Sequence, residues 1–153
     1  MRFRKTNNAF IVVLLFTSIV STLTIAEGHE AEMPSLYTRL GGYDAVAAVV
    51  DDFIGRLIAD PQLTKFFTGF SDDSKARIRQ HVVDQICAAT GGPCVYTGRD
   101  METSHQGAGI TEEDWNRAAG HLVATLDKFK VPEQEKGEVL ALVSSLKADI
   151  VQK

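Results

Sequence analysis

From Ser35 onward, apolar residues recur at intervals of three and four, and this periodicity is the strongest constraint on the fold. Such spacing places apolar side chains on one face of an α-helix, whereas a half-buried strand requires strict alternation. No stretch of the sequence alternates in that way. The sequence therefore predicts an all-α fold.

About four substantial helices and several short ones are expected from the pattern. Thr111 is expected to cap one of the long helices, because the acidic residues at 112–114 suit the positive end of a helix. Pro132 suits the first turn of the last helix. In chain order, the helical segments are expected at 35–40, 43–59, 61–67, 74–90, 101–105, after Thr111, and from Pro132 through Ile150.

The first 26 residues differ from the rest in charge and hydropathy. Basic residues at 2, 4 and 5 precede an uncharged stretch of eighteen residues, 9–26, which begins strongly apolar and ends in small residues before Glu27. This arrangement predicts a secretory signal peptide over 1–26 and hence an exported, periplasmic protein. The alternative is an uncleaved membrane anchor, although eighteen residues are at the lower limit for a span.

The remainder is expected to form a polar tail, 27–34, followed by one domain, 35–153, because a chain of 153 residues suffices for one core. Residues 27–153 contain 13 Lys and Arg against 20 Asp and Glu, a net charge of −7. Phosphate binding requires a basic surface. Nucleic acid is therefore excluded as the expected partner.

Common catalytic and nucleotide-binding motifs are missing. The sequence contains no GxxxxGK[ST], GxGxxG, GxSxG or HExxH pattern. It also lacks CxxCH, the motif for covalent attachment of c-type haem.

Two histidines stand near apolar helix faces. His81 is one turn after Ile78 and next to Val82, and His105 ends a short expected helix. A histidine at such a boundary is often structural, but a neutral imidazole is also a frequent ligand of haem iron and other metals. Two histidines on separate helices, among large apolar side chains, would suit a flat apolar cofactor.

Several runs in the sequence, in this order and spacing, resemble the truncated haemoglobins, and specifically their group I, cyanoglobin-like branch. They are SLYTRLGG at 35–42, FF at 66–67, AATGGP at 88–93, YTGRDM at 96–101 and HQGAGIT at 105–111. The resemblance covers about 35–151, nearly all of the expected mature chain.

This resemblance implies a two-over-two helical sandwich around a non-covalently bound b-type haem. His105 matches the proximal iron ligand, and Phe67 matches a residue that packs against the haem face. Arg99 falls near the haem propionates, or is a solvated loop charge. The full set of residues expected to bind the cofactor is Phe53, Ile54, Phe66, Phe67, Ile78, Val82, Arg99, Met101, Ile110 and Trp115, with His105 and His81 as metal ligands.

The sequence departs from the family on the distal side of the haem. Group I members commonly place a Tyr, which bonds to the bound gas, where this chain has Ile54. They commonly support it with Gln on the distal helix, where the corresponding positions in this chain are Ile78 and Val82. His81 and Gln85 remain as polar residues there. His81 matches a second iron-ligating His of some cyanobacterial relatives, or else it turns to solvent or to a propionate.

The two cysteines flank a Gly-Gly-Pro turn, and export favours a disulfide between Cys87 and Cys94. The alternative is a buried free Cys87 with an exposed Cys94. Some relatives cross-link haem through a His of the last helix, but 132–153 contains none. His121 is expected to be structural.

The main hypothesis is an exported haem protein that binds a diatomic gas: dioxygen, nitric oxide or carbon monoxide. Turnover of nitric oxide, as in a dioxygenase, or of peroxide is a further activity that such a site supports. One alternative is electron transfer with a redox partner, through stable ligation by both histidines. Another is a haem-free helical interaction module.

Overall fold

The computed structural model describes residues 33–152, and all regular secondary structure within them is helical. The expected signal peptide, 1–26, and most of the polar tail lie outside the described residues. The helices are α1 (Leu36–Arg39), α2 (Gly42–Ala59), the 3₁₀ helix η1 (Thr64–Phe67), α3 (Asp72–Ala89), α4 (Met101–His105), α5 (Glu112–Lys128), α6 (Glu133–Ser144) and α7 (Lys147–Ile150). Within this part of the chain, no helix is both long and apolar enough to span a membrane.

Side-chain caps explain where several helices begin. The Ser71 hydroxyl accepts from the Ser74 amide (3.2 Å) at the start of α3, and the Asp100 carboxylate accepts from the Thr103 amide (2.7 Å) at the start of α4. At α5, the predicted cap Thr111 is confirmed, and Asp114 bonds back to it to complete a capping box.

The last helix differs from the prediction, because it breaks into α6 and α7. The Ser145 hydroxyl donates to the Leu142 carbonyl (2.7 Å), and the Leu146 amide bonds three residues back, to Val143 (3.0 Å). A hydroxyl that bonds to the preceding turn competes with the regular helical pattern. The apolar stripe continues across the break, so periodicity alone did not reveal it.

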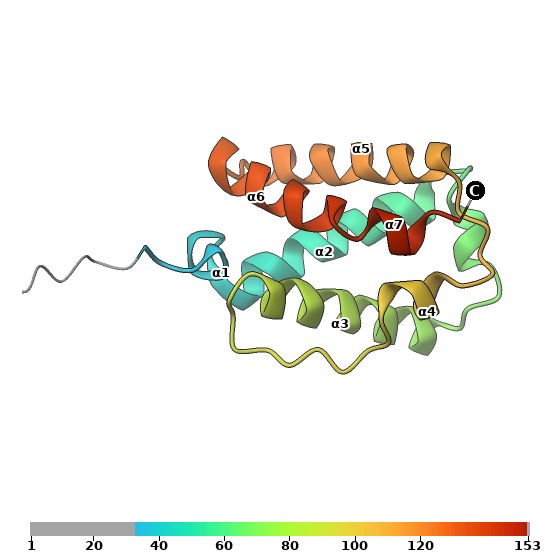
Figure 1. Ribbon diagram of the computed structural model, residues 1–153, viewed down its shortest axis with the longest axis horizontal. Helices are drawn as coiled ribbons and strands as arrows, with labels where there is room; N and C mark the ends of the chain where they lie inside the picture. Colours follow the sequence, from blue (N-terminus) through green and yellow to red (C-terminus); the bar gives the residue numbers. More distant parts are fainter. Residues whose placement is uncertain (1–32, 153) are drawn as a thin grey trace, which may run out of the picture. The chain divides into compact units, whose positions relative to one another are not determined.

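Helix α2 lies between α3 and α5 and packs against both (Figure 1). On one side, Val46 and Val50 are buried against Val83 of α3. On the other, Phe53 packs against a second buried cluster, in which Leu122 and Leu126 of α5 meet α6. The pairs α2–α3 and α5–α6 thus form the predicted arrangement of two helices over two, and α4 packs against α7.

The structure confirms the predicted disulfide. Cys87, fully buried near the end of α3, is bonded to Cys94, with their Cα atoms 5.7 Å apart. Gly92 allows the chain to turn back, since a Cβ there would lie 2.6 Å from the Tyr37 ring and 2.7 Å from the Cys87 sulfur. The bond therefore fixes the start of the loop 93–100 to the end of α3.

Candidate functional site

A cavity of about 840 Å³ lies among α2, η1, α3, α4, α5, α6 and α7, and most of its walls are apolar. It brings together every residue that the sequence singled out for a cofactor or metal. These are Phe53, Ile54, Phe66, Phe67, Ile78, His81, Val82, Arg99, Met101, His105, Ile110 and Trp115. The residues come from five helical elements and two loops, so only the folded chain brings them together.

His105, the last residue of α4, is half-buried in the wall of this cavity. Its Nδ1 lies 2.8 Å from the Met101 carbonyl oxygen. A carbonyl only accepts, so Nδ1–H is the donor and Nε2 is the nitrogen with a free lone pair. This is the form in which a neutral imidazole binds a metal, with its ring orientation fixed by the other nitrogen.

His81 enters the same cavity from α3 and is held differently. Its Nδ1 is buried and has no hydrogen-bond partner within the described residues. The ring meets Tyr96 edge-on, with centroids 6.0 Å apart and an interplanar angle of 80°. A buried polar atom without a partner costs free energy, and no hydrogen bond from the described residues to Nδ1 fixes the ring of His81.

The distal wall is almost entirely apolar. Helix α2 contributes only apolar side chains to the lining, including Ile54, while α3 adds Ile78 and Val82 beside His81 and Gln85. Tyr96 also lines the cavity, but its hydroxyl donates to the Arg99 carbonyl (2.5 Å). Burial, with a smaller contribution from nearby Asp100, raises the pKa of Tyr96, which keeps this donor protonated.

Two exposed arginines lie at the edge of the cavity, Arg77 from α3 and Arg99 from the loop before α4. Neither forms an ion pair within residues 33–152; Arg77 donates to the Ser74 hydroxyl (3.2 Å). A guanidinium group binds carboxylates with charge-assisted hydrogen bonds. The sequence analysis missed Arg77, although its position one turn before His81 on the same helix was a usable signal.

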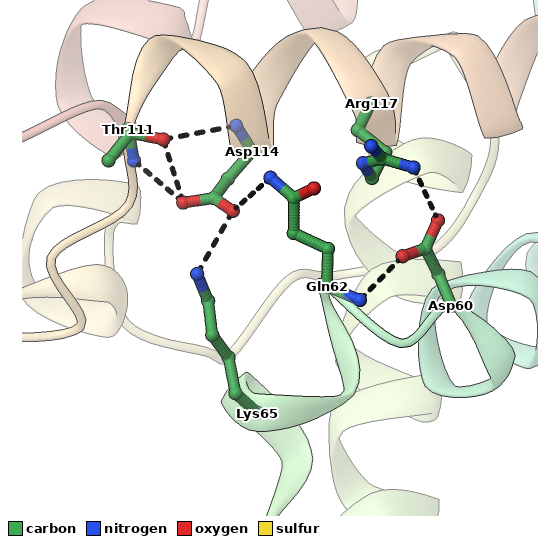
Figure 2. Close-up of polar contacts among 6 residues, drawn as sticks. All are labelled: Asp60, Gln62, Lys65, Thr111, Asp114 and Arg117. Carbon is green, nitrogen blue, oxygen red and sulfur yellow. Dashed lines mark hydrogen bonds and ion pairs between the residues drawn. The ribbon is translucent and has the colours of Figure 1, made fainter.

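A cluster of polar side chains, which we call the polar frame, joins η1 and the end of α2 to α5 (Figure 2). Its members are Asp60, Gln62, Lys65, Thr111, Asp114, Arg117 and His121. The frame holds the segment that bears Phe66 and Phe67 against the first turns of α5. It was not foreseen, because its residues are far apart in the sequence.

Asp114 is the buried centre of one half of the frame, with 2% of its surface exposed. It accepts from the Thr111 hydroxyl (2.8 Å), Lys65 (3.1 Å) and Gln62 (3.4 Å). Burial alone would raise the pKa of Asp114, but these hydrogen bonds outweigh it and lower the pKa to about 2. The carboxylate is therefore ionised at neutral pH.

Asp60 is the centre of the other half. It accepts from His121 Nε2 (2.7 Å), from the Gln62 amide (2.8 Å) and, more weakly, from Arg117 (3.5 Å). The bond from His121 lowers the pKa of Asp60 most, to about 2 in spite of burial. His121 does not line the cavity. These contacts agree with the structural role expected for His121.

The sequence also matches a known protein family. Residues 35–152 match the model of a family described as bacterial-like globin. A group 1 truncated haemoglobin of Mycolicibacterium paratuberculosis is 39% identical over 126 residues, 82% of this chain and 90% of that protein. One from Synechocystis is 34% identical, over 74% of this chain and 92% of the relative.

Two solved haemoglobin structures are similar in fold to this chain. A two-over-two haemoglobin of Synechococcus, in the cyanomet state and with covalently attached haem, superposes with a TM-score of 0.71 at 32% identity, covering 78% of this chain and all of that one. The ferric truncated haemoglobin of Tetrahymena pyriformis superposes with a TM-score of 0.70 at 25% identity, over 78% of this chain and 100% of that one.

Proposed function

The chain belongs to the bacterial-like globins, in the group I truncated haemoglobins, and from this premise we propose that it is an exported haem protein that reversibly binds a diatomic gas. In this proposal His105 is the permanent axial ligand, and His81 is a sixth ligand that the gas displaces. The observation that carries the proposal is the cavity itself. It is large and apolar, and an imidazole with a free Nε2 lies in its wall.

The residues present fit a b-type haem. The apolar body of the porphyrin suits walls formed by side chains such as Phe53, Phe67 and Trp115. The unpaired Arg77 and Arg99 at the edge are suited to its two propionate carboxylates. When bound, haem would supply an iron that can bind a gas and change its redox state. The absence of His in 132–153 supports non-covalent binding.

His81 provides the distal chemistry of the proposal. Its Nδ1, which has no partner within the described residues, and its place in a mostly apolar distal wall leave it free to reorient toward the centre of the cavity. If His81 bound the iron, it would exclude the gas, and the observed gas affinity would fall by the fraction of open molecules. Once displaced, its ring can donate a hydrogen bond to the gas, a role for which α2 offers no polar side chain.

Export is part of the same proposal. The Cys87–Cys94 disulfide supports it, because such bonds persist in oxidising compartments and are rare in the cytosol. The basic, then apolar, segment 1–26 supplies the expected signal. Fractionation of producing cells tests this point: the expected product is periplasmic and begins at Glu27, whereas a cytosolic protein that retains 1–26 would contradict it.

The decisive experiment for function is an absorption spectrum of the purified protein, ferric and ferrous, with and without carbon monoxide. We expect a Soret band with one haem per chain, extractable into acidified organic solvent, and saturable binding of carbon monoxide. A protein purified without haem and unable to take it up would contradict the proposal. A haem protein that does not bind carbon monoxide would instead support electron transfer through stable ligation by both histidines.

A further inference from the structure

The loop that follows His105 is tied to the far end of the chain by one residue, Gln152. Its side-chain Nε2 donates to the His105 carbonyl (2.7 Å), and its Oε1 accepts from the Gly109 amide (3.0 Å). Its own backbone amide donates to the Ile110 carbonyl (2.9 Å). Three hydrogen bonds from a single residue thus reach both ends of the loop 106–110.

The loop needs such a restraint. Helix α4 has only five residues, too few to be stable alone, and His105 is its last. The carbonyl of a terminal helical residue lacks a helical partner; that of His105 accepts from the Ala108 amide (3.0 Å) and from Gln152. Gly107 and Gly109 adopt positive φ values of 78° and 68°, and glycine at both positions makes the free loop flexible.

We propose that Gln152 is a positioning residue for the iron ligand, an inference that rests on the proposed role of His105. The Met101 carbonyl fixes the His105 ring through Nδ1, and Gln152 fixes the backbone of the same residue through its carbonyl. Together they set the direction in which Nε2 points. Gln152 does not line the cavity, so it would act only through the position of His105.

The test uses full-length haem-loaded protein that carries His81→Leu, which leaves His105 as the only axial histidine. Gln152→Met removes both side-chain bonds, Gln152→Glu keeps an acceptor for Gly109 but loses the donor to His105, and both retain the backbone bond to Ile110. Gln134→Met is the matched control, since Gln134 is exposed on α6 and bonds only to Glu138 (3.2 Å). The readouts are the iron–imidazole stretching frequency of the ferrous form and the rate of haem transfer to apomyoglobin.

We expect Gln152→Met and Gln152→Glu to shift or broaden the stretching band and to speed haem loss roughly tenfold, in keeping with a loss of one to two hydrogen bonds. Gln134→Met should match its parent in both readouts. An unchanged band and release rate in both Gln152 variants, or a change confined to Gln152→Met, would overturn the inference. A parent that shows no iron–imidazole band would instead contradict the proposed function itself.

Discussion

The two histidines that line the cavity differ in how firmly the rest of the chain holds them. His105 has a partner on its ring, at Met101, and two donors on its carbonyl. Within residues 33–152, His81 has a buried Nδ1 without a partner and an edge-on contact with Tyr96. This part of the fold therefore fixes the ring of His105 through a hydrogen bond and provides no such bond to Nδ1 of His81.

The difference matches what each side of a reversible binding site requires. A permanent ligand must stay oriented when the cofactor is loaded, and hydrogen bonds to its ring and backbone provide that. A displaceable ligand must leave at small cost, which a network of hydrogen bonds would prevent. Both properties follow from contacts of the chain itself.

Removal of His105 should have the largest effect. His105→Ala is expected to abolish stoichiometric haem retention, because only apolar contacts, the two arginines at the edge and the poorly fixed His81 would remain. The Soret absorbance per chain after gel filtration measures it. His121→Gln is the control and should retain haem, since His121 lies outside the cavity and bonds to Asp60. Full haem content with an unaltered spectrum in His105→Ala would show that His105 is not the permanent iron ligand.

Loss of the disulfide should come next. The bond closes a ring of eight residues, 87–94, and in the chain-entropy model it stabilises the folded state by about 2.5 kcal/mol. Cys94→Ala should lower the free energy of unfolding by about that amount in urea titrations, and reduction of the wild type should do the same. Two free thiols per chain in exported, denatured protein would refute the bond.

Asp114 tests how firmly the polar frame holds η1 against α5. Asp114→Asn should destabilise the protein by about 2 kcal/mol, because Thr111 and Lys65 lose a charged acceptor in a buried position. Lys65→Met is the comparison, and its cost should stay below about 1 kcal/mol because the Lys65 side chain is 55% exposed. Equal losses in the two variants would contradict a frame centred on Asp114.

Low pH should weaken the polar frame of the wild-type protein. The pKa values of Asp60 and Asp114 are lowered to about 2 in the folded protein, whereas an unfolded Asp titrates near pH 4. Their contribution is therefore complete above about pH 4 and is lost as the pH falls toward 2. Urea midpoints measured between pH 5 and pH 2 should fall, and should fall less steeply in Asp114→Asn. The same change of the urea midpoint with pH in both proteins would show that Asp114 does not contribute to the loss of stability in acid.

The sequence predicted most of what local rules control. Apolar spacing located the long helices, Thr111 was identified as a cap, and the ordered motifs picked out residues that all line one cavity. Periodicity could not detect the break at Ser145, because a hydroxyl bond to the preceding turn leaves the apolar pattern unchanged.

Contacts between segments that are distant in the chain could not be predicted from the sequence. Asp60 and His121, or Gln152 and His105, are separated by 61 and 47 residues, and nothing in either local sequence marks the other as a partner. Arg77 is different, since helical spacing from His81 places it on a neighbouring part of the same face. It was overlooked because a charged residue on an exposed helix position is ordinarily solvated.

Carbon monoxide binding to the wild type and to His81→Leu tests the contrast between a fixed and a displaceable histidine most directly. We expect the wild type to be low-spin in both oxidation states without gas, and to bind carbon monoxide at a rate limited by the departure of His81. His81→Leu should be high-spin or water-bound, should bind carbon monoxide faster because no histidine has to leave first, and should gain apparent affinity by the inverse of the open fraction. A wild type that is already high-spin at neutral pH, with binding kinetics that His81→Leu does not alter, would contradict the account.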